Sequence, residues 1–237
     1  MARPARLLIA VGLAVSAIAA LTVPHDAVAQ HTSVWSCTDG LVAVKATSES
    51  AAETVCEQAA KAREFLGTCG ITGRSELMVH VTPFMARTRG RRVGDYNPAQ
   101  ARIRLLPYSS FVRISKPTLG LTPVLSRILH ASVAAHEIAH GIFHDHIGQR
   151  VLTDNAHEYV AYVVQLSTLP EAVQKNLREE NAGPPVTNLF MFSFFLLMAD
   201  PERFGLAAWR HFHQPENGCA FLHRVAAGAV HFPPPGD

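Results

Sequence analysis

Residues Val124 to His144 read VLSRILHASVAAHEIAHGIFH. The segment contains no proline, and its apolar residues recur at helical spacing. Thr122 and Pro123 come directly before it, and this pair suits the N-cap and the first position of a helix. The sequence therefore predicts a long helix from this point to about His144.

Within this helix His136, Glu137, Ile138, Ala139 and His140 form the motif H-E-x-x-H. Side chains four residues apart lie on the same face of a helix, so both imidazoles can bind one ion. Glu137 is rotated from His136 by about 100°, which places its carboxylate beside the ion without making it a ligand. A zinc ion lowers the pKa of a bound water to about 7, and a carboxylate in this position can take its proton as general base. The motif thus predicts Zn²⁺ bound by His136 and His140, with Glu137 as a catalytic residue.

Catalytic zinc usually has three protein ligands, so the motif leaves the site one ligand short. Glu158 is one candidate, because it lies in HEYVAYVVQ, which predicts a helix, and a turn before Asp154 would bring that helix back against the first. Its apolar neighbours predict burial, where an unpaired carboxylate is costly. His146, six residues after His140, is the alternative. It has the spacing of the metzincin pattern H-E-x-x-H-x-x-G-x-x-H, but Phe143 stands where that pattern requires glycine.

The motif and Glu158 together resemble the gluzincin metallopeptidases, in which a second helix supplies a glutamate ligand. The resemblance covers only about residues 136–165, and it implies that the two histidines and Glu158 bind Zn²⁺ while Glu137 is the base. Tyr162 stands where thermolysin-like members carry an aspartate that orients a zinc-bound histidine, so the surroundings of the histidines must differ here. The chain also looks like small exported bacterial proteins built around this motif whose substrates are unassigned.

A hydrolase of this kind needs a donor that stabilises the oxyanion of the transition state. Tyr162 is the predicted catalytic donor, because it lies one turn beyond Glu158. The other candidates are His157, Tyr159, His211, His213 and His223.

The first thirty residues have the pattern of a secretory signal peptide. Two arginines precede an uncharged apolar run from Leu7 to Leu21, and the small residues AVA end at Ala29. An uncleaved membrane anchor is the alternative, because the run is near the shortest length that spans a bilayer. We expect residues 1–29 to be removed, which leaves an exported, periplasmic or secreted chain from Gln30 without a stable membrane span.

All four cysteines, Cys37, Cys56, Cys69 and Cys219, lie in the mature part. An even number in an exported chain predicts two disulfides, and three pairings are possible. A cysteine metal site is the weaker alternative, because the chain has no C-x-x-C pair. Since three cysteines lie near the mature N-terminus and one near the C-terminus, at least one bridge should join these two regions.

The predicted fold class is α+β, with a small N-terminal α/β lobe that contains a β-sheet and a mainly helical C-terminal lobe. We expect one zincin-like catalytic domain over residues 30–237, divided into lobes at 30–121 and 122–237, with the motif helix at the junction. Helices are predicted at residues 48–67, 123–144, 154–164, 170–178, 201–209 and 219–227, and strands at 76–81 and 102–106. The apolar segment from Leu189 to Ala199 predicts a buried core helix.

A zincin-like sheet presents an edge strand along which an extended peptide pairs. Of the predicted strands, Arg102 to Leu106 is the nearest in sequence to the motif helix, and we predict that it forms this edge.

A net charge of only +2 gives no basic surface of the kind that nucleic acid binding requires. The sequence predicts a zinc-dependent peptidase with a peptide or protein substrate, in which Glu137 activates the water. Two alternatives stay open: a zinc hydrolase of a non-peptide substrate, and a non-catalytic zinc-binding or interaction module. The oligomeric state is not predicted.

Overall fold

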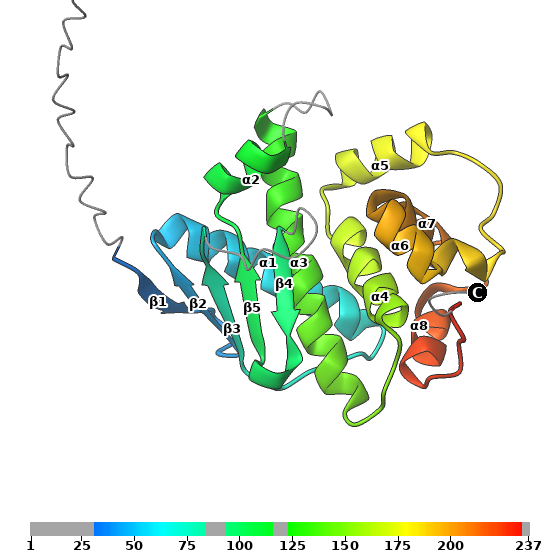
Figure 1. Ribbon diagram of the computed structural model, residues 1–237, viewed down its shortest axis with the longest axis horizontal. Helices are drawn as coiled ribbons and strands as arrows, with labels where there is room; N and C mark the ends of the chain where they lie inside the picture. Colours follow the sequence, from blue (N-terminus) through cyan, green and yellow to red (C-terminus); the bar gives the residue numbers. More distant parts are fainter. Residues whose placement is uncertain (1–30, 84–92, 116–122, 234–237) are drawn as a thin grey trace, which may run out of the picture. The chain divides into compact units, whose positions relative to one another are not determined.

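A mixed sheet followed by helices makes up the computed structural model, which describes residues 31–83, 93–115 and 123–233 (Figure 1). The fold is α+β, as the sequence predicts, with the sheet and one helix in the N-terminal half and a mainly helical C-terminal region. The expected signal peptide at residues 1–29 and the expected helix cap at Thr122 lie outside the described residues.

Five strands of the described chain form one sheet in the order β1-β2-β3-β5-β4. They are β1 (Ser33–Ser36), β2 (Val42–Ala46), β3 (Leu77–Val81), β4 (Gly94–Asn97) and β5 (Arg102–Leu105). The central strands β2, β3 and β5 run parallel, and each outer strand runs antiparallel to its neighbour. Val44, Val79 and Ile103 stand in register across the central strands and are fully buried. This apolar row is the part of the core that the sheet supplies.

The predicted edge strand is wrong, because β5 lies inside the sheet between β3 and β4. The edge on that side is β4, which is joined to β5 by a tight turn over Pro98–Gln100 (η1). The physical reason lies in the two sequences. RIRL in β5 alternates and buries Ile103 against β3, whereas GDYN in β4 has no apolar alternation and suits only an outer position.

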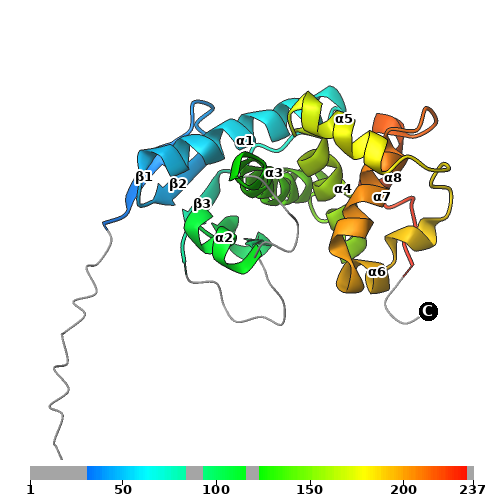
Figure 2. The ribbon, with the colours of Figure 1, turned by 90° about the horizontal axis from the view of Figure 1, so that it is seen from above.

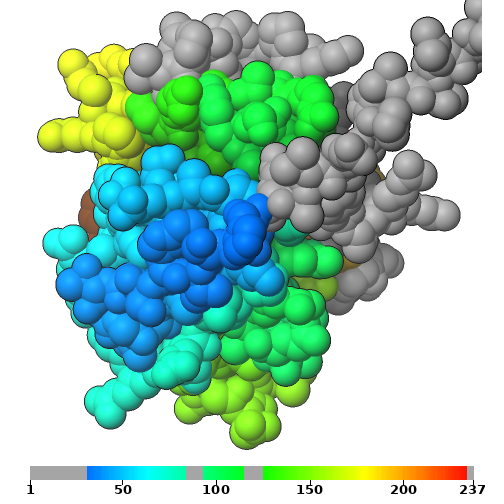
Figure 3. Space-filling model, turned by 90° about the vertical axis from the view of Figure 1, so that its left-hand side faces the viewer, coloured from blue at the N-terminus to red at the C-terminus, as the bar shows by residue number. Residues whose placement is uncertain are grey.

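The helices follow the predicted positions closely, with α2 as an addition. They are α1 (Glu49–Thr68), α2 (Tyr108–Ser115), α3 (Pro123–Ile147), α4 (Asp154–Ser167), α5 (Glu171–Glu180), α6 (Phe194–Ala199), α7 (Pro201–Phe212) and α8 (Gly218–Ala226). Helix α1 joins β2 to the parallel strand β3, and Ser48 caps it by accepting the N–H of Ala51 at 3.3 Å. Figure 3 shows the side of the molecule that carries β1, where β1, β2 and α1 form the centre of the visible surface.

Helix α3 lies between α1 and α4 and packs against the sheet (Figure 2). Its contact with β3 is close at Gly141, where a Cβ atom would lie 2.8 Å from both methyl carbons of Leu77. The helix ends at Ile147, and Gly148 reverses the chain with φ of 61° before α4 begins. The predicted helix–turn–helix is therefore confirmed, and it brings α4 back against α3.

The prediction of one buried helix from Leu189 to Ala199 is wrong. The segment divides at Ser193 into a 3-10 turn, η3 (Leu189–Phe192), and the short helix α6. Ser193 accepts the N–H of Leu196 at 3.3 Å, so a hydroxyl competes with continuation of a single helix. Three large apolar side chains of the segment are exposed: Phe190, Phe195 and Met198.

Two disulfides link the cysteines, Cys37 to Cys56 and Cys69 to Cys219. The second joins the end of α1 to α8, which confirms the expected bridge between the N-terminal and C-terminal regions. Near it, His223 of α8 contacts the carbonyl oxygen of Cys69. Among the described residues, no helix is both long and apolar enough to cross a membrane.

Removal of the Cys69–Cys219 bridge should destabilise the protein more than removal of the other bridge. It joins cysteines that are 150 residues apart in the sequence, against 19 for Cys37–Cys56. A bridge that closes a longer loop restricts the unfolded chain more, so the unfolded chain gains more entropy when that bridge is removed. The Cys69→Ser/Cys219→Ser variant should lose about 2–5 kcal/mol in urea denaturation. A larger loss in Cys37→Ser/Cys56→Ser would contradict the assigned role of the long bridge.

His211 should make the protein sensitive to acid. It is 5% exposed, and its Nδ1 lies 2.7 Å from the hydroxyl of Tyr159 in the core between α4 and α7. Burial lowers the pKa of His211 from 6.5 to about 4. The unfolded chain therefore binds this proton at a higher pH than the folded protein does. The contribution of His211 to the free energy of unfolding is fully present above pH 6.5 and falls by up to about 3 kcal/mol as the pH drops to 4. Denaturation of wild type and His211→Phe across this range should give a shallower pH slope for the variant; equal slopes would assign the acid sensitivity to other histidines.

Candidate metal centre

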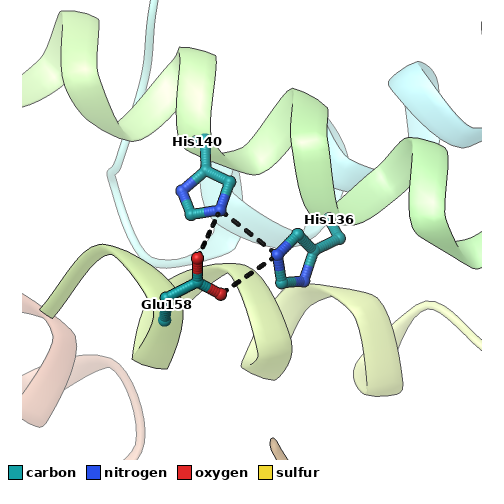
Figure 4. A group of neighbouring side chains, drawn as sticks. All are labelled: His136, His140 and Glu158. Carbon is teal, nitrogen blue, oxygen red and sulfur yellow. Dashed lines mark hydrogen bonds and ion pairs between the residues drawn. The ribbon is translucent and has the colours of Figure 1, made fainter. Parts of the chain in front are cut away.

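Three side chains from α3 and α4 bring their donor atoms together (Figure 4). Nε2 of His136 lies 3.2 Å from Nε2 of His140 and 3.3 Å from Oε2 of Glu158. Nε2 of His140 lies 3.6 Å from Oε1 of Glu158. All three ligand atoms lie within 4.8 Å of one another, so the group can hold a metal ion.

The helical period places these side chains where they meet. His136 and His140 lie one turn apart on α3, and Glu158 and Tyr162 lie one turn apart on the face of α4 that meets α3. The remaining sides of α4 carry fully buried apolar residues that fix the helix in the core: Val160, Ala161, Val163 and Val164. The polar face therefore turns toward the two imidazoles.

The charges in this group depend on one another. Burial alone would raise the pKa of Glu158, but the hydrogen bond to His136 and the nearby imidazoles lower it to about 2, so the carboxylate is anionic. Burial lowers the pKa of His140 to about 3, which leaves that ring neutral. Burial also opposes a charge on His136, yet the contact with Glu158 outweighs it and raises the pKa of His136. Without a metal ion, a proton between His136 and Glu158 satisfies these groups. A bound cation would replace that proton.

The donor set restricts the kind of metal. Calcium and magnesium take oxygen ligands, whereas two imidazole nitrogens and one carboxylate oxygen suit zinc and the first-row transition metals. The side chains of His136 and His140 are 10% and 12% exposed, and that of Glu158 is 27% exposed. An ion at this place would thus be largely enclosed by protein.

Glu137 lies between α3 and the edge strand β4. It is 6% exposed, and a Cβ atom added to Gly94 would lie 2.6 Å from its Oε1 atom. Its charge is also felt by His136 and by Tyr162, whose pKa values it raises. The carboxylate is therefore next to the donor group and next to the backbone of the strand that ends the sheet.

Two tyrosine rings border the histidines. Tyr162 meets the ring of His136 edge to face, with centroids 4.6 Å apart. Burial, followed by the charges of Glu158 and Glu137, raises the pKa of the Tyr162 hydroxyl well above its usual range, so it keeps its proton. On the other side, Tyr96 of β4 lies parallel to His140, with centroids 6.5 Å apart.

His146 is not part of the group. Its Nδ1 accepts the backbone N–H of Thr72 at 3.3 Å, in the connection that follows α1. A position six residues after His140 on a helix that continues to Ile147 points away from the ion, because no glycine ends the helix earlier. Glu158 is the residue that the structure brings to the two histidines.

Most of the other candidates for the oxyanion donor have partners elsewhere. Tyr159 and His211 bind each other in the C-terminal core. His213 interacts with the carbonyl of Trp209, and His223 with that of Cys69. His157 packs against Phe143 with ring centroids 5.4 Å apart, and its ring centroid lies 6.4 Å from that of His140. Tyr162 is the candidate whose ring contacts His136.

Comparison with protein families gives one match. Residues 42–234 match DUF6639, a family of unknown function. The chain belongs to the DUF6639 family. No curated protein and no solved structure matches it. The match covers strands β2 to β5, the motif helix and all three donor residues, so the site lies within the matched part of the chain.

Two contacts in this DUF6639 chain were not predicted from the sequence. Oε1 of Gln165 lies 3.0 Å from Nδ1 of His136, and Nε2 of Gln165 donates to Oγ of Ser132 at 3.1 Å. Both residues lie on the faces of α3 and α4 that meet. Ser132 comes one turn before His136, and Gln165 comes two turns after Glu158. Helical spacing alone could have placed these two residues on the same faces as the donors. An uncharged glutamine and serine, however, do not by themselves indicate a metal site.

A cavity in the described residues lies apart from this group. A cavity of about 570 Å³ lies between α1, the first half of α3 and the ends of β3 and β5, and none of the three donor residues lines it. The arrangement of donor atoms, rather than a hollow, identifies the candidate site in this DUF6639 chain.

Replacement of Gly94 by alanine should disturb Glu137. The added methyl group would lie 2.6–2.9 Å from three atoms of the Glu137 side chain, which is enclosed between α3 and β4. We expect a loss of about 1–3 kcal/mol in urea denaturation. Gly67→Ala is the matched control, because nothing lies within 4 Å of its added methyl group and alanine favours the helix. Unchanged stability in Gly94→Ala would show that β4 does not hold Glu137.

Proposed function

We propose that this protein is an exported zinc-dependent peptidase. The observation that carries the proposal is the juxtaposition of His136, His140 and Glu158 with the carboxylate of Glu137 beside them. A purely structural zinc site has four protein ligands and no use for a further buried carboxylate. Three protein donors with an adjacent acid are instead typical of a hydrolytic site with one open position.

The spacing of the donors supports zinc. Ligands held tetrahedrally about 2.1 Å from an ion lie about 3.4 Å from one another. An octahedral ion at the same bond length would place them about 3.0 Å apart. The separations of 3.2, 3.3 and 3.6 Å fit the tetrahedral arrangement better. Tetrahedral coordination is the usual preference of zinc in proteins.

In this proposal each residue has one task. His136, His140 and Glu158 would hold the zinc, which would supply Lewis-acid chemistry for the activation of a water at neutral pH. Glu137 accepts the proton of the attacking water at its carboxylate and passes it to the leaving amine. Tyr162 keeps its proton because of burial, so its hydroxyl can donate a hydrogen bond to the developing oxyanion.

The position of β4 supports a peptide as the substrate. Among the described strands β4 is paired on one side only, with β5. An extended peptide that added to this edge would form backbone hydrogen bonds with it. Glu137 touches Gly94 of the same strand, so the paired peptide would lie next to the general base. An ester or another non-peptide substrate gains nothing from pairing with an edge strand.

Export agrees with the cysteines. Both disulfides are the kind of bond that persists in an oxidising, extracytoplasmic compartment. The signal-peptide pattern at residues 1–29 points to the same route. The proposed partner is a peptide or protein substrate in the periplasm or outside the cell.

The metal content of the purified protein tests the site. Elemental analysis should find one zinc per chain in wild type and in Glu137→Gln, because Glu137 is not a ligand. Glu158→Ala should lose the metal, whereas His146→Ala should retain it, since His146 binds Thr72 instead. Loss of zinc in His146→Ala with retention in Glu158→Ala would reverse the assignment of the third ligand. Absence of zinc from wild type after reconstitution would end the proposal.

Cleavage of a peptide library, followed by mass spectrometry, completes the same test. Wild type should release defined fragments, and Glu137→Gln should cleave at least about 10²-fold more slowly with its zinc still bound. Zinc binding without cleavage of any peptide, combined with hydrolysis of an ester or amide, would favour the non-peptide hydrolase. A zinc with four protein ligands and no activity would favour a binding module.

A further inference from the structure

We propose that Gln165 and Ser132 are positioning residues for the metal centre. Gln165 fixes the ring of His136 so that Nδ1 carries the proton and Nε2 faces the other two donors. The inference rests on the proposed metal site and assigns it two residues outside the H-E-x-x-H motif.

The argument begins at Ser132, which is 2% exposed. Its hydroxyl donates to the carbonyl oxygen of Leu129 at 2.8 Å. A hydroxyl has one proton, so the oxygen can only accept from its second neighbour. That neighbour is Nε2 of Gln165, at 3.1 Å. Ser132 therefore selects the orientation of the Gln165 amide.

The orientation of the amide in turn selects the tautomer of His136. With Nε2 bound to Ser132, Oε1 of Gln165 lies 3.0 Å from Nδ1 of His136. An amide oxygen only accepts, so Nδ1 must carry a proton. A neutral imidazole has one N–H, which leaves a lone pair on Nε2. That nitrogen faces His140 and Glu158 at 3.2 and 3.3 Å.

The reverse orientation would oppose metal binding. The NH₂ group of Gln165 would then donate to Nδ1 of His136, and the proton of the neutral ring would have to lie on Nε2, between the donors. Ser132 would also have to give up its bond to Leu129 in order to donate to Oε1. Because His136 is 8% exposed, water is a poor substitute for either partner.

The two histidines differ in this respect. In the described part of the chain, Nδ1 of His140 has no hydrogen-bond partner, and its ring is bordered by the parallel ring of Tyr96. His136 is thus the ring whose protonated nitrogen is fixed by a polar group. A metal-bound histidine whose second nitrogen has such a partner binds more tightly, and loss of the partner costs about 10–100-fold in metal affinity.

Zinc affinity, measured by competition with a chromophoric chelator, tests the inference. Gln165→Leu has no acceptor for Nδ1 and should bind zinc about 10–100-fold more weakly. Gln165→Glu keeps an acceptor for the Nδ1 proton and should bind zinc at least as tightly as wild type. Ser132→Ala removes only the group that orients the amide, so its affinity should fall between those of wild type and Gln165→Leu.

Nuclear magnetic resonance of the zinc-loaded protein gives a second readout. The Nδ1 proton of His136 should exchange slowly with water in wild type and rapidly in Gln165→Leu. Gln174→Leu is the matched control: Nε2 of Gln174 also makes two hydrogen bonds, at 2.9 and 2.8 Å, but neither reaches the metal centre. The Gln174→Leu variant should be less stable than wild type, but its zinc affinity and the exchange of the His136 proton should be unchanged.

The outcomes separate the two proposals. Wild-type zinc affinity and a protected His136 proton in Gln165→Leu would overturn the positioning role while leaving the zinc site in place. Absence of zinc binding in wild type would overturn the proposed function and this inference with it. If Gln165→Leu does not fold, Ser132→Ala decides, and affinity and proton exchange equal to those of wild type would overturn the inference.

Discussion

A partly buried carboxylate between two imidazoles joins α4 to α3. Glu158 comes from α4, and its oxygens lie 3.3 and 3.6 Å from nitrogens of His136 and His140 on α3. Removing a carboxylate from water costs several kcal/mol unless an opposite charge or hydrogen bonds compensate. The two helices can therefore bury Glu158 only in the register that brings these three groups together. The same register places Tyr162 against His136 and brings Gln165 within reach of its far nitrogen.

Small residues let neighbouring elements approach this helix pair closely. Gly141 allows α3 to lie against Leu77 of β3, and Gly94 allows β4 to lie against Glu137. Gly205 of α7 lies against the ring of Tyr162, where a Cβ atom would overlap a ring carbon. Each contact would be lost or strained with a larger side chain, because protein interiors have little room to adjust. The backbone at these three glycines thus lies directly against Leu77, Glu137 and Tyr162.

The sequence predicted what local spacing determines. H-E-x-x-H and the helical period place the two histidines together, and the cost of a buried carboxylate identified Glu158. Features that depend on pairing between distant segments were missed: β4 forms the edge because β5 has the apolar alternation that an inner strand needs. The apolar run at Leu189 was assigned by composition alone, although the hydroxyl of Ser193 divides it. Gln165 was overlooked because an uncharged amide becomes informative only when its partner is known.

The choice of an amide at position 165 has an electrostatic consequence. In the thermolysin-like proteins that the motif resembles, a carboxylate orients a zinc-bound histidine. Here a divalent ion would be balanced by Glu158 and Glu137, and a third carboxylate would leave a buried site with net negative charge, which is costly. Gln165 accepts the hydrogen bond of His136 without that charge, and its NH₂ group binds Ser132, which a carboxylate cannot do as a donor. In the proposed site, the ring of His136 is thereby oriented without a further buried charge.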